Sequence, residues 1–293
     1  VGSEMCIRDR LKLQKQNMSE HKLVFAIYGN AYKRQAILPF IERAVAYLES
    51  HHATPLVEPE NIEGVDYVIS MGGDGTFLEA ANKVGDREIP ILGVNMGRLG
   101  FLADVLPSEI ETTLDHVLRG DHIIEDHTVI KLETNGETVE CNPFALNDIA
   151  VLKRDSASMI SIRAYVNGDF LVNYQADGLI IATPTGSTAY SLSNGGPIIV
   201  PQSGSLCITP VAPHSLNIRP IVINDTSVIE LEVCSRSHNF LVAVDGRSMK
   251  MAEETRLTIC KAPYTIKLIK LKSQRYFSTL HEKLMWGADT RQR

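Results

Sequence analysis

The 293-residue sequence lacks the features that mark membrane proteins, secreted proteins or proteins stabilised by a structural zinc ion. No apolar run approaches the roughly 20 residues that a membrane helix needs, and the N-terminus has no signal-peptide core. The cysteines are odd in number, widely spaced and without a Cys-x-x-Cys pair, which disfavours a disulfide framework or a zinc site: Cys6, Cys141, Cys207, Cys234 and Cys260. These absences predict a cytoplasmic protein with no membrane partner.

An excess of positive charge is also absent. The formal net charge of −6 argues against electrostatic capture of nucleic acid, so a small molecule is the expected nucleotide partner. The sequence contains no Gly-Lys pair and no Gly-x-Gly-x-x-Gly after a strand, which excludes the two commonest nucleotide-binding motifs. The nine histidines show no metal-ligand spacing, and we interpret them as surface or satisfied structural residues.

The first half of the chain alternates strand and helix patterns, which predicts a Rossmann-like parallel α/β domain over residues 18–125. Residues 1–17 are polar and aperiodic, and we interpret them as a leader, tag or artefact, with a genuine N-terminal arm as the alternative. The expected strands are 23–28, 66–71 and 89–94, and the expected helices are 35–50 and 77–84.

The second half changes to period-2 alternation with Asn-Gly steps, which indicates antiparallel hairpins. We therefore predict an all-β, sandwich-like domain over residues 126–270. The last segment, residues 271–293, contains an amphipathic stretch at 278–286 that we expect to pack back on the α/β domain.

The stretch SMGGDGTFLEAA, residues 70–81, predicts a glycine turn between a strand and a helix. Such a turn lies where open α/β sheets bind ligands and where helix N–H groups attract anions. We expect Gly72, Gly73 and Gly75 to adopt positive φ and to let a phosphate approach closely. Asp74 would repel a phosphate unless it accepts a proton or faces a cation, and both are roles in phosphoryl transfer. The alternative is a plain helix cap through the N–H of Thr76 or Phe77.

A second unusual stretch is QADGLIIATPTGSTAYSLSNGGPII, residues 175–199. Its hydroxyls and bare glycines suit a polyhydroxylated, phosphate-bearing ligand such as a ribose nucleotide. The alternative is a solvated Ser/Thr-rich loop. Its hydroxyl-bearing residues are Thr183, Thr185, Ser187, Thr188, Tyr190, Ser191 and Ser193.

These motifs, together with GRLGF at 97–101 and the Asn147-Asp148 pair, resemble the bacterial NAD kinases over nearly the whole chain. The GGDGT element is shared with lipid and sugar kinases, whereas TPTGSTAYSLSNGGP is highly specific. The resemblance implies transfer of the γ-phosphoryl group of ATP, or of polyphosphate, to the 2′-hydroxyl of the adenosine ribose of NAD, with a divalent cation such as Mg²⁺. It also implies an active site between the two domains and a homodimer or homotetramer.

By this resemblance Asp74 is the catalytic proton acceptor, Asn147 and Asp148 hold ribose hydroxyls, and Asp177 holds the nicotinamide end or its ribose. The 188–193 stretch lines the adenosine pocket. The remaining implied binding residues are Gly73, Gly75, Phe101, Ser158, Gln175, Thr185, Thr188, Ala189, Tyr190, Ser191, Leu192, Ser193, Ala212, Asp245 and Arg247.

The sequence departs from the common family pattern at two positions. Asp148 stands where Glu is frequent, and Gln175 stands where many relatives carry Arg, which leaves the acceptance of NADH open. Two further classes remain as alternatives: a lipid or sugar kinase that uses GGDGT alone, and a non-catalytic dinucleotide sensor. An assay of ATP, Mg²⁺ and NAD for NADP separates them.

Overall fold

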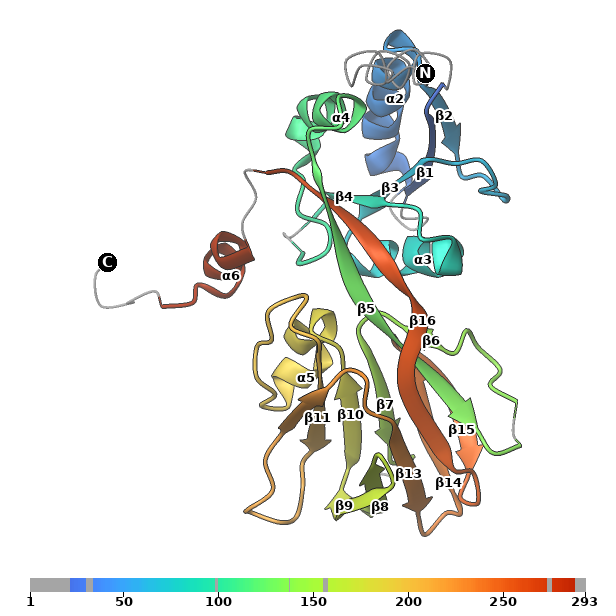
Figure 1. Cartoon of the computed structure of the whole chain (residues 1–293), viewed down its shortest axis with the longest axis vertical. Helices are drawn as coiled ribbons and strands as arrows, with labels where there is room; N and C mark the ends of the chain where they lie inside the picture. Colours follow the sequence, from blue (N-terminus) through green and yellow to red (C-terminus); the bar gives the residue numbers. More distant parts are fainter. Residues whose placement is uncertain are drawn as a thin grey trace, which may run out of the picture. The chain divides into compact units, whose positions relative to one another are not determined.

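The computed structural model describes residues 22–29, 34–97, 100–136, 138–154, 158–272 and 276–287 (Figure 1). The segment interpreted as a leader lies outside these residues. The chain divides into two compact units. Unit 1 comprises the described residues up to 77 and those of 89–122, and unit 2 comprises 78–88 and the described residues from 123 onward.

Unit 1 is built on a parallel sheet in the order β2-β1-β3-β4. The middle residues of β1 and β3, and all of β4, are buried. Burial on both faces explains the continuous apolar runs in the sequence and confirms the predicted parallel α/β arrangement. The strands are β1 Val24–Gly29, β2 Thr54–Val57, β3 Tyr67–Gly72 and β4 Ile91–Asn95.

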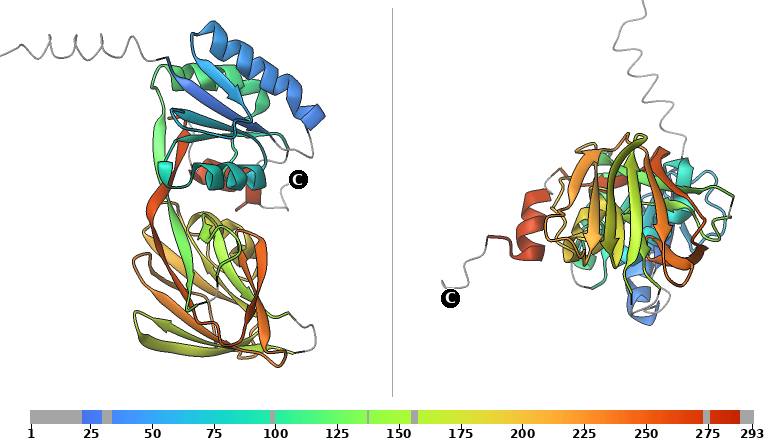
Figure 2. Two further views of the ribbon diagram at one scale, coloured as in Figure 1. Left: turned by 90° about the vertical axis from the view of Figure 1, so that its right-hand side faces the viewer. Right: turned by 90° about the horizontal axis from the view of Figure 1, so that it is seen from below.

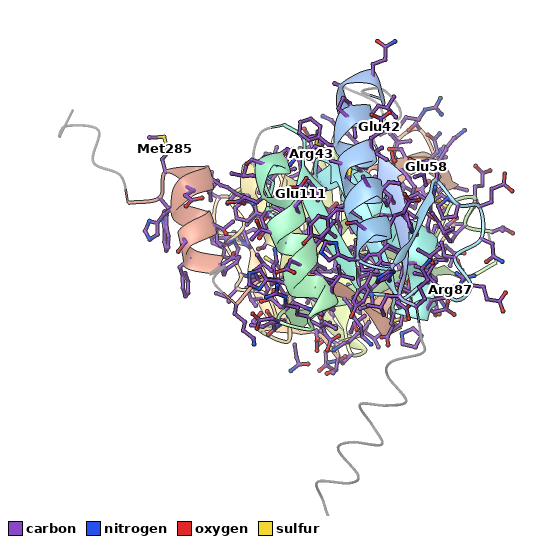
Figure 3. The ribbon with its side chains drawn as sticks, turned by 90° about the horizontal axis from the view of Figure 1, so that it is seen from above. Glu42, Arg43, Glu58, Arg87, Glu111 and Met285 are labelled. Carbon is purple, nitrogen blue, oxygen red and sulfur yellow. The ribbon has the colours of Figure 1, made fainter. Side chains whose placement is uncertain are left out.

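Two helices of unit 1, α2 (Arg34–Ser50) and α4 (Ile110–Leu118), pack against each other. Each buries an apolar stripe at helical spacing; in α4 it consists of Ile110, Thr113, Leu114 and Val117. On the surface Arg43 of α2 contacts Glu111 of α4 at 3.2 Å (Figure 3). The i, i+3, i+4, i+7 spacing of α4 is visible in the sequence, yet the sequence prediction did not include this helix.

Unit 2 contains two antiparallel sheets. The first has the order β6-β5-β16-β13-β8-β9, and the second has the order β12-β11-β10-β7-β14-β15. The strands of the first sheet are β5 Ile123–Thr134, β6 Phe144–Ala145, β8 Ile160–Val166, β9 Asp169–Ala176, β13 Ile229–Cys234 and β16 Leu257–Lys270. Those of the second are β7 Asp148–Leu152, β10 Gly178–Ala182, β11 Ser205–Val211, β12 Ile221–Asn224, β14 Asn239–Val244 and β15 Arg247–Ala252.

The core of unit 2 lies between these sheets, whose strands are seen from two sides in Figure 2. Alternate residues of β8, β13 and β16 meet alternate residues of β7, β10 and β14, with Phe240 and Tyr174 among the largest buried side chains. This is sandwich packing, as the period-2 pattern predicts. The opposite face of the second sheet carries mostly small side chains, the alanines Ala150, Ala182 and Ala243, together with Ile180.

Two hairpin turns of unit 2 have left-handed residues at both central positions, which defines type I′ turns that match the strand twist. Asn167-Gly168 joins β8 to β9 with φ of 54° and 84°, and Asp245-Gly246 joins β14 to β15 with φ of 46° and 78°. The Asn-Gly step at 135–136 is different. It begins a longer connection from β5 to β6; these strands pair antiparallel, as predicted, but they are not joined by a two-residue turn.

The remaining helices are short. They are α3 Asp74–Val84, α5 Tyr190–Ser193, α6 Tyr276–Leu284, and the 3₁₀ turns Gly85–Arg87, Pro107–Glu109 and Thr185–Thr188. Helix α6 covers most of the amphipathic segment expected at 278–286 and buries Leu280; its packing on the α/β domain stays a prediction. Within the described part of the chain, every helix is too short or too polar to span a bilayer.

Candidate functional site

The glycine turn of unit 1 joins β3 directly to α3, and the helix begins at Asp74, three residues earlier than predicted. Positive φ was expected at Gly72, Gly73 and Gly75, and this is wrong, since none of them adopts it. Gly72 is required for another reason: a Cβ there would lie 2.1 Å from Thr76 Oγ1. At Gly73 and Gly75 a Cβ would meet nothing within 4 Å. The turn therefore leaves open space beside two bare backbone positions.

The Asp74 carboxylate accepts three backbone hydrogen bonds from the segment after β4. Phe101 N–H donates to Oδ2 at 2.9 Å, and the N–H groups of Leu102 and Ala103 both donate to Oδ1 at 3.1 Å. A carboxylate offers about four lone-pair positions, so one position on Oδ2 remains for a further donor. These bonds show that Asp74 does more than cap its own helix.

Gly100 is where the two sequence motifs of unit 1 meet. A Cβ at this position would lie 1.9 Å from Asp74 Oδ1, so any side chain would displace the carboxylate. Gly100 is not among the site residues predicted from the GRLGF motif, and its close approach to Asp74 adds it to them. Its signal was present, because a glycine between apolar residues marks a close approach of backbone and another group.

In unit 2 the organising group is Asp245, in the turn between β14 and β15. Its Oδ2 accepts the N–H of Leu146 at 2.8 Å, while its Oδ1 accepts the N–H groups of Asn147 at 2.8 Å and of Asp148 at 3.1 Å. These bonds join Asp245 to the backbone that carries the Asn-Asp pair and fix the position of Asn147 and Asp148. As on Asp74, one acceptor position remains on Oδ2, and the ligand-binding role that the resemblance implies for Asp245 stays a prediction.

Asp148 lies next to this second carboxylate and is itself buried. Burial and the nearby Asp245 charge raise the pKa of Asp148 to about 7. Burial also raises the pKa of Asp245, although its three N–H donors and Arg247 act in the opposite direction. A carboxyl group that titrates near neutral pH can both accept and donate hydrogen bonds to a vicinal diol.

We expect the raised pKa of Asp148 to make the folded state less stable as pH rises from about 4 to about 7. Over this range the folded protein holds a proton that the unfolded chain, with a carboxyl pKa of about 3.9, has released. Asp148→Asn should remove this part of the pH dependence, so the variant should gain several degrees in melting temperature relative to wild type at pH 7.5 but little at pH 4.5. Equal differences at both pH values would contradict the assignment.

The TPTGST turn is fastened to the same backbone segment. Thr183 Oγ1 donates to Leu146 O at 2.5 Å, the Thr183 N–H donates to Asn147 O at 2.9 Å, and Gly186 N–H donates to Thr183 Oγ1 at 3.1 Å. A Cβ on Gly186 would lie 2.0 Å from Asn147 O. The two motifs of unit 2 thus form one rigid substructure, which the sequence alone did not reveal.

A cavity of about 350 Å³, which we call cavity A, lies over the small-residue face of the second sheet. Tyr190 is 40% exposed there. The floor of cavity A includes Ala150 and Ala243, whose small side chains leave room above the strands. The lining comprises Asn147, Asp148, Ala150, Leu152, Ala189, Tyr190, Ala243, Asp245, Gly246 and Ser248.

Several hydroxyl groups that the sequence pattern predicted to contact a ligand form hydrogen bonds within the protein instead. Ser187 Oγ donates to Pro184 O at 2.6 Å, Thr188 Oγ1 to Thr185 O at 3.3 Å, and Ser191 Oγ shares a 2.8 Å hydrogen bond with Thr209 Oγ1. Ser187 and Ser191 are completely buried. Their conformation does not support ligand contacts through these side chains, whereas Ser193 is exposed and Leu192 half-buried on the same turn.

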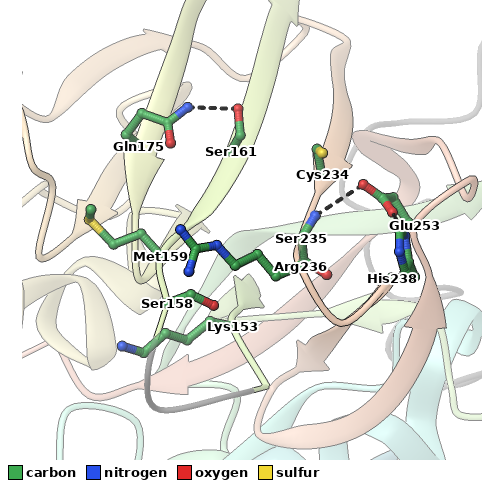
Figure 4. A pocket seen from close by; sticks show the side chains of 10 residues that line it. All are labelled: Lys153, Ser158, Met159, Ser161, Gln175, Cys234, Ser235, Arg236, His238 and Glu253. Atoms are coloured by element: carbon green, nitrogen blue, oxygen red, sulfur yellow. Dashed lines mark hydrogen bonds and ion pairs between the residues drawn. The ribbon is translucent and has the colours of Figure 1, made fainter.

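A second cavity of about 530 Å³, cavity B, holds two other predicted residues, Ser158 and Gln175 (Figure 4). Gln175 Nε2 donates to Ser161 Oγ at 2.8 Å. Lys153 lines the cavity and forms a 2.7 Å ion pair with Asp177, a partner that the sequence analysis missed. Cavity B is thus separate from the lining of cavity A, and the structure does not bring all predicted residues of unit 2 into one pocket.

Ala212 and Arg247 complete the predicted set. Ala212 has φ of 43°, a left-handed conformation that a non-glycine residue seldom adopts. Arg247 Nη2 donates to Phe144 O at 3.0 Å, and its buried Nε has no hydrogen-bond partner among the described residues. The guanidinium is therefore partly engaged by the chain, and its Nε–H is a buried donor that a ligand could use.

No group of three or more His, Cys, Asp or Glu side chains in the described ranges could hold a metal ion.

A carboxylate in an open glycine turn at the end of a parallel strand, and a hydroxyl-rich turn beside a cavity, are the arrangement expected of a nucleotide-dependent kinase. Sequence comparison identifies which kind. Residues 5–123 match the ATP-NAD kinase N-terminal domain, and residues 146–271 match the ATP-NAD kinase C-terminal domain. The chain belongs to the ATP-NAD kinase family.

Named relatives agree with this assignment. The NAD kinase of Bacteroides fragilis is 52% identical over 288 residues, which cover 91% of this chain and 99% of the relative. The NAD kinase of Porphyromonas gingivalis is 46% identical, with 89% of this chain and 88% of the relative covered.

Solved structures share the fold. A crystal structure of an NAD kinase from Archaeoglobus fulgidus in complex with ATP has a TM-score of 0.75 at 28% identity, covering 90% of this chain and 99% of that one. Yeast NADH kinase complexed with NADH has a TM-score of 0.83 at 21% identity, covering 94% of this chain and 90% of that one. At that identity the second comparison supports the fold alone.

Proposed function

We propose that this protein is an NAD kinase that transfers the γ-phosphoryl group of ATP to the 2′-hydroxyl of the adenosine ribose of NAD and so produces NADP. The single observation that carries the proposal is Asp74, the carboxylate held by three N–H groups in the glycine turn with one acceptor position left open. Family membership supplies the substrates, and the wild-type enzyme tests them: ATP, Mg²⁺ and NAD should give NADP. A lipid or sugar kinase, or a sensor without activity, would give none.

Asp74 acts in this scheme as the proton acceptor. A ribose hydroxyl is a poor nucleophile, and a carboxylate within hydrogen-bond reach can take its proton while the new P–O bond forms, an effect worth roughly 10²- to 10⁴-fold in rate. The three N–H donors hold the carboxylate in one orientation, so little rearrangement is needed at the moment of reaction. The open space beside Gly73 and Gly75 admits the phosphate chain.

The dinucleotide side of the reaction belongs to unit 2 in this proposal. Asn147 and Asp148 present an amide and a carboxyl group at the edge of cavity A, and together they offer donors and acceptors for the two hydroxyls of a ribose. Tyr190 supplies an exposed aromatic face at the same cavity for a base.

Tyr190→Ala should raise the KM for NAD about 10-fold or more while the KM for ATP stays within twofold, because stacking of a base on an aromatic ring contributes roughly 1–3 kcal/mol. Steady-state kinetics with each substrate varied at saturating concentration of the other measure the two constants. Tyr165→Ala is the matched control, since Tyr165 of β8 packs edge-to-face against Phe170 of β9 in the same unit. Equal increases in both constants would place the 185–193 turn at the phosphoryl donor.

Three accompanying properties complete the proposal. Mg²⁺ would neutralise the phosphates of ATP and would be bound mostly by them. A homodimer or homotetramer is expected; the exposed Phe170 on the terminal strand β9 offers an apolar contact surface. A cytoplasmic location fits the cysteine pattern. Sedimentation of the purified protein tests the oligomeric state.

A further inference from the structure

His127 is the one histidine among the described residues that is buried to 5% exposure, and it lies in the middle of β5. Its Nδ1 is 2.7 Å from Thr185 Oγ1, although the two residues are 58 positions apart in sequence. Thr185 is the first residue of the 3₁₀ turn that leads to Ala189 and Tyr190. A buried imidazole thus contacts the turn that forms one wall of cavity A.

The direction of this hydrogen bond follows from the other side of the ring. His127 Nε2 lies 3.6 Å from Glu125 Oε2 and has no hydrogen-bond partner among the described residues. The His127 ring lowers the pKa of Glu125, which keeps that carboxyl group ionised, and Lys270 acts in the same direction. A carboxylate at this place favours the tautomer with its proton on Nε2. Nδ1 then accepts, and the Thr185 hydroxyl donates.

Apart from His127, no described residue outside the turn forms a hydrogen bond with the Thr185 side chain. On one side the turn is bound to Leu146 and Asn147 through Thr183 and Gly186. Farther along the turn, Ser191 is bound to Thr209 of β11. His127 supplies a further attachment, at the start of the turn and from a strand of the other sheet. Each attachment reduces the freedom of the turn to move, and preorganised binding groups cost less entropy when a ligand binds.

We infer that His127 is a positioning residue for the dinucleotide: backed by Glu125, it holds the Thr185 hydroxyl and thereby fixes the 185–193 turn, with Ala189 and Tyr190, against Asn147 and Asp148. His127 has this role only if the protein acts on NAD, as proposed above. The sequence analysis assigned all nine histidines to surface or structural positions, and the structure singles this one out by its contact with a motif residue.

A double-mutant cycle tests the link. His127→Leu and Thr185→Val each remove one partner of the hydrogen bond, and each should raise the KM for NAD about 3- to 10-fold, the range that one hydrogen bond of ordinary strength supplies. Because both changes remove the same bond, the KM for NAD of the double variant should exceed that of the more strongly affected single variant by no more than about twofold. The KM for ATP and the kcat at saturating NAD should stay within twofold of wild type.

Two further variants separate positioning from general damage. His127→Asn places an amide oxygen near the position of Nδ1 and should restore the KM for NAD to within about twofold of wild type. His116→Leu is the matched control, since His116 pairs with Asp121 at 3.1 Å in unit 1 and should leave both KM values unchanged. Thr185→Val does not alter the buried ring, so it remains informative if His127→Leu fails to fold.

The outcomes are distinct. Additive effects of the two single substitutions, or a rise in the KM for ATP equal to that for NAD, would overturn the role of His127 while leaving the kinase assignment intact. Wild-type protein that makes no NADP would instead overturn the proposed function. Calorimetric titration of NAD into the same variants shows whether the expected 3- to 10-fold loss also appears in direct binding.

Discussion

Asp74→Asn should lower the kcat for NADP formation roughly 100-fold or more while NAD still binds. Asn keeps the size of the side chain but cannot accept a proton. It also replaces one acceptor oxygen by an NH₂ group that would face the backbone N–H groups of residues 101–103. A stability loss of about 1–3 kcal/mol should therefore accompany the loss of rate. Steady-state kinetics and thermal melting measure the two effects separately.

Asp66→Asn is the matched control for this substitution. Asp66 precedes β3 at the end opposite the glycine turn, and its Oδ2 accepts the Val24 N–H at 2.8 Å, so it is a structural carboxylate of the same unit. The control should lower the melting temperature and leave kcat within a few-fold of wild type. If Asp74→Asn also retains near-normal kcat, the turn only cradles phosphate and the assignment of Asp74 as the base is wrong.

Asp245→Asn should reduce kcat/KM for NAD about 100-fold, because a displacement of about 1 Å in a positioned group can cost that much. The amide keeps one acceptor oxygen but replaces the other by an NH₂ group that would face the N–H groups of residues 146–148, which should destabilise the protein by about 1–3 kcal/mol. Asn tolerates left-handed φ and favours type I′ turns, so the turn itself should persist. Loss of the negative charge should also lower the pKa of Asp148.

Asp225→Asn provides the comparison for Asp245. Asp225 is a buried carboxylate of unit 2 that pairs with Lys261 Nζ at 2.5 Å. Its substitution should destabilise the protein without changing kcat/KM for NAD. A comparable loss of kcat/KM in both variants would show that the loss of any buried charge in unit 2 lowers activity. The assignment of Asp245 as the residue that positions Asn147 and Asp148 would then be wrong.

Sequence patterns sufficed for the fold because its determinants are local. Continuous apolar runs predicted β1, β3 and β4 of unit 1 but not β2, whose residues are half-buried or exposed, and the Asn167-Gly168 step predicted the β8–β9 hairpin. The errors also have local causes. Positive φ was inferred for Gly72, Gly73 and Gly75 from glycine content alone, but a glycine can be required by crowding, as Gly72 is by Thr76.

The site was harder to predict because its contacts join distant segments. Ser191 and Thr188 are both hydroxyl residues of the same motif, but their contacts differ. The Ser191 hydroxyl shares a buried hydrogen bond with Thr209, whereas the Thr188 hydroxyl donates to a carbonyl of its own turn. The contacts of Asp74 with residues 101–103, of Asp245 with residues 146–148 and of His127 with Thr185 depend on strand order and register. No pattern in a single sequence encodes those pairings.

The structural contacts of Asn147 are formed by its backbone. Its N–H is held by Asp245, its carbonyl receives Thr183, and Gly186 packs directly on that carbonyl. The fold therefore does not depend on the amide side chain of Asn147. Mutational scanning should find position 147 permissive for expression but selective for substrate, while position 186 should accept only glycine. Such a position allows the preference of an enzyme for its acceptor to change during evolution without loss of the fold.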